Sequence, residues 1–96
     1  MSQQILVSTD VAIDLKPLLE AAIRSELQML ELSLDRTARR LRNFETQYGL
    51  PSEEFIRRFE AGELDESLDY IEWACEIKTY HLLQTQWRAL QSVHFQ

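Results

Sequence analysis

The sequence is poor in residues that several classes of protein require. A single cysteine, Cys75, excludes an intramolecular disulfide and gives no sign of an oxidising compartment. No apolar run approaches the roughly 20 residues that a membrane-spanning helix needs. The first residues also lack the basic flank and apolar stretch of a signal peptide. We therefore expect one domain in the cytoplasm, without a membrane span.

Basic charge is scarce as well. The chain has 10 Lys and Arg residues against 16 Asp and Glu residues, which gives a net charge of −6. The imbalance lies in the second half: residues 1–50 carry 7 acidic and 6 basic side chains, and residues 51–96 carry 9 and 4. A negative field repels nucleic-acid phosphates and anionic membranes. A basic protein partner is therefore expected, and nucleic acid is not.

Helix breakers are few, and their positions divide the chain. Asp14 suits a helix N-cap, and no glycine or further proline follows Pro17 until Gly49. Gly49 suits the left-handed position that ends a helix, and Pro51 enforces the break. The sequence therefore predicts one long helix over residues 15–48.

The N-terminal arm, residues 1–14, has a different pattern. It contains the segment QILVSTDVAID, in which β-favouring residues come first and apolar residues then alternate with polar ones. This predicts a short strand, or two very short ones. Because a lone strand cannot satisfy its own backbone groups, we expect pairing with a second copy of the chain or with a partner's sheet edge.

The long helix carries a heptad seam, in which apolar residues recur with alternating gaps of four and three. Thr37 is the polar residue at one position of this seam. Two interpretations stay open: the seam packs on another copy and gives a helical dimer, or it packs on the last helix of the same chain. The seam residues are Ile23, Leu27, Leu30, Leu34, Leu41 and Phe44.

Two further helices are predicted, over residues 52–61 and 66–93. Ser52 is expected to cap the first with its hydroxyl, Gly62 to end it, and Asp65 or Ser67 to cap the second. The last helix has two adjoining apolar stripes, which make a face wide enough for more than one neighbour. One stripe is Leu68, Ile71, Cys75 and Leu82; the other is Trp73, Ile77, Tyr80, Trp87 and Leu90.

No constellation of residues indicates catalysis or metal binding. His81 and His94 are thirteen residues apart, whereas ligands on one helix face need a spacing of three or four. Cys75 lies in an apolar stripe, which is typical of a buried and inert thiol. Acid pairs such as Glu53 with Glu54 are ordinary on protein surfaces. We therefore assign no catalytic residue, no metal ligand and no cofactor, and expect a protein that is not an enzyme.

Charged runs offer two interpretations each. Seven acidic residues and no basic one lie between Glu60 and Glu76, which indicates either a solvated helix face or a docking surface for a basic partner. The basic cluster of the long helix is by default a solvated face, and its alternative role is weak nucleic-acid binding. That cluster is Arg36, Arg39, Arg40 and Arg42.

The spacing in the middle of the chain carries a family resemblance. The segments are FExxYGLxSEEF from Phe44, FExGEL from Phe59, and the pair Glu72-Trp73. They resemble small prokaryotic proteins, frequent in cyanobacteria and archaea, with a signature close to FExxYGMSSEEFxxxFExGELGDDxDxxEW. The resemblance covers about a third of the chain, and Pro51 and Glu66-Ser67 depart from it. It implies an antitoxin-like member of a two-gene toxin–antitoxin module.

These expectations combine into a mainly α domain with a short N-terminal strand, then a long, a short and a long helix, forming a helical dimer. The favoured function is binding and neutralising a cognate toxin, basic and nuclease-type. A homo-oligomeric helical scaffold or regulatory protein is the alternative, and a weak nucleic-acid binder the second. The expected partner anchors are Phe55, Phe59 and Trp73, for which core packing is the alternative, and the charged surround is Glu60, Glu63, Asp65, Asp69 and Glu72.

Overall fold

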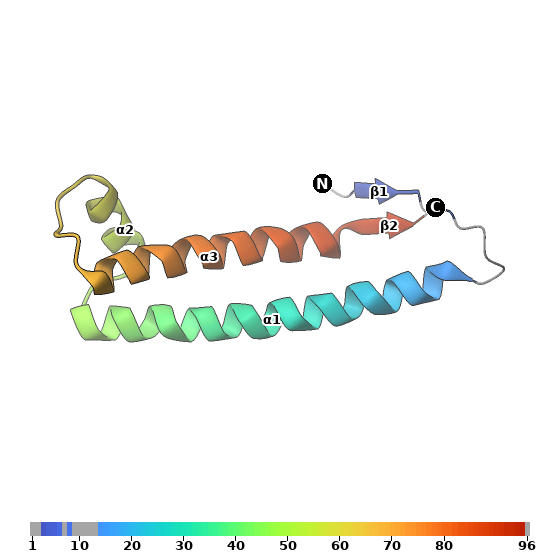
Figure 1. The fold of residues 1–96 in the computed structure, drawn as a ribbon, viewed down its shortest axis with the longest axis horizontal. Coiled ribbons are helices and arrows are strands. Elements are labelled where there is room, and N and C mark those ends of the chain that lie inside the picture. Colours follow the sequence, from blue (N-terminus) through green and yellow to red (C-terminus); the bar gives the residue numbers. More distant parts are fainter. Residues whose placement is uncertain (1–2, 7, 9–13, 96) are drawn as a thin grey trace.

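Two long antiparallel helices lie side by side in the computed structural model, which describes residues 3–6, 8 and 14–95 (Figure 1). Helix α1 spans Leu15–Tyr48 and helix α3 spans Leu68–Gln91. The short helix α2, Ser52–Glu60, lies in the connection between them, at one end of the hairpin. The molecule is elongated, with extents of 59 × 22 × 19 Å. The mainly helical fold predicted from the sequence is confirmed.

Local chemistry sets the helix ends. The Asp14 carboxylate accepts a hydrogen bond from the Lys16 backbone N–H, 3.3 Å away, at the start of α1. Gly49 ends α1 with φ of 63° and ψ of 37°, a left-handed conformation that costs a residue without Cβ little. Gly62 takes a φ of 75° after α2. Ser67 caps α3 by accepting the Tyr70 N–H at 3.2 Å.

Three predicted helix limits differ from the structure by one or two residues, and one predicted cap is wrong. Helix α2 ends at Glu60 rather than 61, and α3 begins at Leu68 rather than 66. Helix α3 ends at Gln91 rather than 93, because Val93 begins an extended segment. Helix α2 has Pro51 at its N-cap position with no side-chain cap bond. Ser52 is the first helical residue, and its hydroxyl instead accepts the Trp73 indole N–H at 2.9 Å. Its own N–H donates to Glu45 Oε2 at 2.8 Å.

Two three-residue strands lie at the open end of the hairpin. Strand β1, Gln3–Ile5, pairs in parallel with β2, Val93–Phe95, with Gln4 opposite His94. The pairing is therefore within one chain, and not with the second copy or partner edge that we expected. The extended segment that follows α3 supplies the neighbour that β1 needs (Figure 1). Most of the predicted strand beyond β1, residues 7 and 9–13, lies outside the described residues.

The core lies at the α2 end of the hairpin. Phe55 of α2 and Trp73 of α3 are fully buried, and Ala74 and Ile77 of α3 join them. Side chains from all three helices and the two connections pack against this cluster: Leu41, Phe44, Leu50, Ile56, Phe59, Leu64 and Tyr70. The small helix therefore closes the hairpin by covering one end of the α1–α3 contact.

The heptad seam of α1 packs on α3 of the same chain. Leu30 and Thr37 are buried on the seam, and Leu41 and Phe44 pack against the core. Ile23, Leu27 and Leu34 are only half-buried. Of the two interpretations left open by the sequence, the structure shows the intramolecular one. Helix α3 alone covers the seam of α1 incompletely, because only one face of each helix meets the other.

Candidate partner-binding surface

The aromatic residues expected to anchor a partner belong to the core. Phe55 and Trp73 each have 0% of their surface exposed, and Phe59 is half-buried against Phe55. Phe44 and Tyr48 of α1 stack on Trp73 with ring centroids 5.5 and 5.8 Å away. Of the two interpretations given for Phe55 and Trp73, the structure shows core packing. Their burial follows from the meeting of three helices, which the sequence does not show.

The acidic residues lie on the surface near the same end of the hairpin. Glu60, Glu63, Asp65 and Glu66, at the end of α2 and in the turn after it, are exposed. Glu63 lies 3.9 Å from the Arg57 guanidinium. No ion pair or hydrogen bond between described residues engages the carboxylate of Glu60, Asp65 or Glu66, or that of Glu72 on α3. These four carboxylates are therefore available to a partner.

Asp69 has a different role from the one we expected. It accepts hydrogen bonds from the Tyr48 hydroxyl and, at 3.5 Å, from the Gln47 amide. The hydrogen bond to Asp69, with a smaller contribution from desolvation, raises the pKa of Tyr48 to about 12. Asp69 thus ties the end of α1 to the start of α3. Its observed contacts are therefore within the hairpin.

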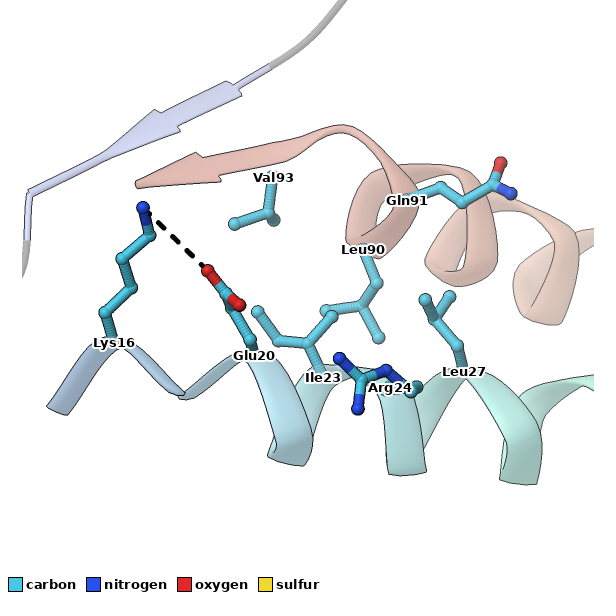
Figure 2. Close-up of a pocket in the computed structure, with 8 residues that line it drawn as sticks. All are labelled: Lys16, Glu20, Ile23, Arg24, Leu27, Leu90, Gln91 and Val93. Atoms are coloured by element: carbon cyan, nitrogen blue, oxygen red, sulfur yellow. Dashed lines mark ion pairs between the residues drawn. The ribbon is translucent and has the colours of Figure 1, made fainter. Parts of the chain in front are cut away.

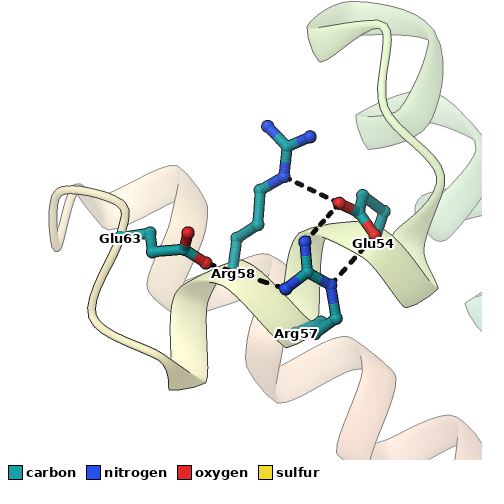
Figure 3. Close-up of polar contacts among 4 residues, drawn as sticks. All are labelled: Glu54, Arg57, Arg58 and Glu63. Atoms are coloured by element: carbon teal, nitrogen blue, oxygen red, sulfur yellow. Dashed lines mark hydrogen bonds and ion pairs between the residues drawn. The ribbon is translucent and has the colours of Figure 1, made fainter.

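A cluster on α2 neutralises part of the acid at this end (Figure 3). Glu54 accepts hydrogen bonds from Arg57 at 2.6 and 3.1 Å and from Arg58 at 2.9 Å. These bonds lower the pKa of Glu54 to about 2, and Glu54 in turn raises the pKa of Arg57. Residues three and four apart are neighbours on a helix. The spacing Glu54-x-x-Arg57-Arg58 was therefore a readable signal that our sequence interpretation missed.

In the described part of the chain, one arginine of the basic cluster of α1 forms an ion pair with α3, and the other three do not. Arg40 reaches across the hairpin to Glu76 of α3, with 3.4 Å between Nη1 and Oε1. The other Glu76 oxygen, Oε2, is buried without a hydrogen-bond partner. Arg36, Arg39 and Arg42 are exposed. A surface that combines three exposed arginines with a fourth engaged in an ion pair is a weak basis for phosphate binding, given the net charge of −6.

The hollows along the hairpin are open grooves with mixed linings. At the open end, Leu90 of α3 and Val93 of β2 reach toward Ile23 and Leu27 of α1 (Figure 2). The rim there includes the ion pair of Lys16 with Glu20, 4.0 Å apart. A second groove, nearer α2, is lined by Phe44 and by polar or charged side chains that include Arg40 and Glu76. Among the described residues, neither groove is lined by a serine, threonine, cysteine or histidine.

Three further features bear on function. Within the described part of the chain, no three His, Cys, Asp or Glu side chains gather as metal ligands would. None of the helices that the structure describes unites the length and the hydropathy needed to cross a bilayer. Cys75, expected to be buried, is exposed as a free thiol, because its stripe on α3 faces away from α1.

Some apolar side chains near the acidic turn are exposed, unlike the buried aromatic residues. Leu68, at the first position of α3, has 85% of its surface exposed and lies beside the acidic turn. Ile71, one turn further, is 43% exposed. Searches against protein-family models, curated proteins and solved structures found no match, so functional proposals rest on this surface and on the sequence resemblance.

Proposed function

We propose that the chain is an interaction protein without catalytic activity, whose acidic end binds a basic protein partner. The observation that carries the proposal is the group of exposed, unpaired carboxylates around the α2–α3 turn, beside the exposed Leu68. A surface of one charge sign accelerates encounter with a partner of the opposite sign and repels nucleic acid. The available carboxylates are those of Glu60, Asp65, Glu66 and Glu72.

The family resemblance gives this partner a class. An antitoxin-like protein of a two-gene module binds the toxin encoded beside it, and the acid suits a toxin with a basic, nuclease-type surface. Leu68 and the half-buried Phe59 are the apolar contacts in this proposal, and Phe55 and Trp73 support them from the core. Such binding is expected in the cytoplasm and needs no cofactor.

Co-expression with the product of the adjacent gene tests this function. We expect the neighbour to be toxic when expressed alone, and this chain to restore growth and to co-purify with it. A neighbour that is neither toxic nor retained would show that the toxin–antitoxin proposal is wrong. Salt-sensitive retention of the chain on DNA would instead favour the nucleic-acid alternative.

A matched pair of charge reversals tests the surface. The Glu60→Lys/Asp65→Lys variant removes two carboxylates of the acidic turn. Glu26→Lys/Asp35→Lys makes the same change in net charge on exposed positions of α1. We expect only the first variant to lose the partner. Equal losses would mean that net charge, and not this surface, drives binding.

A second candidate, self-association, is favoured by the accessible surface. The chain exposes 7325 Å², whereas a globular monomer of this length exposes about 5,700 Å². Its radius of gyration is 18.7 Å, against about 12 Å for a compact chain of 96 residues. The excess of roughly 1,600 Å² exceeds the roughly 800 Å² per partner that a standard interface buries. We therefore also propose that the chain forms a homo-oligomer.

A further inference from the structure

Helix α3 has an apolar stripe that nothing in the described chain covers. Leu68, Ile71 and Leu82 are 85%, 43% and 58% exposed, and Cys75 between them is exposed too. Successive helical residues are about 100° apart, so this stripe lies on the side of α3 opposite Trp73 and Ile77, which face α1 and α2. The stripe is therefore free for another helix.

Charge along α3 is polarised. The acidic residues of the helix are Asp69, Glu72 and Glu76, all in its first half. From Ile77 to the end of the chain there is no acidic residue, and Lys78 and Arg88 are the basic ones. Two parallel copies of α3 would place acid against acid. Two antiparallel copies that overlap over residues 68–82 bring Lys78 of each to the acidic part of the other.

Thr79 stands at the position that matches Ile71, whereas the two leucines of the stripe are symmetric about Cys75. Leu68 lies seven residues before it and Leu82 seven after it. Glu72 lies three residues before it and Lys78 three after it. A two-fold axis at Cys75 therefore sets Leu68 against Leu82 of a second copy. It brings Glu72 to the level of Lys78 of that copy, on opposite flanks of the contact, where their long side chains can meet. Such agreement of apolar and charged spacing is what an isologous contact needs, because one surface must complement itself.

We infer that the occupant of this stripe is a second copy of the chain, whose α3 packs antiparallel on the first with the axis at Cys75. This inference rests on the self-association proposed above and names its surface. In the dimer the exposed stripe is buried, and the two Glu72–Lys78 pairs fix the register. Leu68 and Glu72 then belong to the contact between copies, and Phe59, Glu60, Asp65 and Glu66 are left for the basic partner.

Crosslinking of the full-length chain tests the axis. A short bismaleimide, which adds to one thiol at each end, is expected to link two copies through Cys75. The control is Cys75→Ser/Leu32→Cys, which moves the only thiol to an exposed position on α1. We expect no covalent dimer from the control. Equal crosslinking of the two proteins would overturn the proposed axis.

A charge swap tests the register by sedimentation equilibrium. Glu72→Lys turns two attractive pairs per dimer into repulsive ones, and we expect about tenfold weaker association. The double variant Glu72→Lys/Lys78→Glu restores both pairs in reversed polarity, and association should return to within about threefold of the wild type. Circular dichroism verifies that each variant keeps its helices.

The possible outcomes separate the two proposals. Rescue by the double variant, together with crosslinking only at Cys75, supports the antiparallel α3 contact. If the chain dimerises equally well in the charge variants and crosslinks equally well through either thiol position, the α3 contact is wrong and self-association through another surface remains. A chain that is monomeric at all concentrations overturns both, while binding of a basic partner to the acidic turn is judged by its own variants.

Discussion

The indole ring of Trp73 lies flat on the phenyl ring of Phe55, with ring centroids 3.9 Å apart and planes inclined by 3°. Phe55 comes from α2 and Trp73 from α3, and Phe44 of α1 stacks on the same indole. All three helices therefore meet at one pair of rings. Because the rest of the hairpin buries little, this contact should dominate the stability of the fold.

Truncating Phe55 tests that dominance. We expect Phe55→Ala to lower the free energy of unfolding by about 3–5 kcal/mol, since it removes a fully buried ring and leaves a cavity. Urea titration followed by circular dichroism measures the change. The control, Leu32→Ala, alters a side chain that is 62% exposed and should cost less than about 0.5 kcal/mol. Similar losses in both variants would contradict the assignment of the core.

The hydroxyl of Ser52 is expected to matter through Trp73. Ser52→Ala leaves the buried indole N–H without its acceptor, 2.9 Å away in the structure, and should cost about 1–3 kcal/mol. Thermal and urea unfolding measure this loss. Ser25→Ala, at an exposed position of α1, serves as the control and should not destabilise the chain. A neutral Ser52→Ala would mean that the indole finds another partner.

Gly49 should resist substitution for a backbone reason alone. An added Cβ would meet nothing within 4 Å, yet the residue has a φ of 63°. Gly49→Ala should therefore lower the free energy of unfolding by about 1–2 kcal/mol, and Gly49→Asn by less, because asparagine tolerates the left-handed region better. Urea titration distinguishes them. If alanine and asparagine cost the same, the conformation is not the cause.

Tyr48 should titrate late. Its pKa rises from 10.0 to about 12 because its hydroxyl donates to Asp69. A raised pKa in the folded state stabilises the protein below pH 10, and that contribution is lost as the pH rises through 12. Absorbance of tyrosinate during alkaline titration should show a step that Tyr48→Phe removes. Asp69→Asn should move the step toward lower pH, and an unmoved step would exclude Asp69 as the cause.

Glu54 should make stability sensitive to acid. Hydrogen bonds from Arg57 and Arg58 lower its pKa from 4.5 to about 2. A lowered pKa in the folded state contributes stability above pH 4.5, which is lost as the pH falls through 2. As the pH is lowered from 4.5 to 2, the urea midpoint of unfolding should fall less steeply in Glu54→Gln than in the wild type. Glu53→Gln, which breaks no ion pair among the described residues, should leave the slope unchanged.

The beginnings and ends of the helices could be read from short segments. Asp14 caps α1, Gly49 and Gly62 take left-handed conformations, and Ser67 caps α3, all through contacts with residues nearby in the chain. The predicted range 15–48 coincides with α1. Ser52 was misread because its hydroxyl had two possible uses, a local cap and a distant indole. The sequence shows only the local one.

The candidate surface was less predictable than the helices. The acidic run was visible in the sequence, but the exposure of Leu68 and Cys75 and the engagement of Asp69 and Glu76 depend on how α3 is rotated against α1. Two apolar stripes on one helix look equivalent as patterns. Only packing decides which one is covered.

The sequence by itself determined that this chain forms three helices, where most of them begin and end, and that its second half is acidic, because capping, glycine conformation and charge are properties of neighbouring residues. The tertiary structure alone decided that the heptad seam of α1 is satisfied by α3 of the same chain. It also decided that Phe55 and Trp73 are core and that the stripe around Cys75 faces outward. Those outcomes depend on contacts between residues far apart in the chain, which no local pattern specifies.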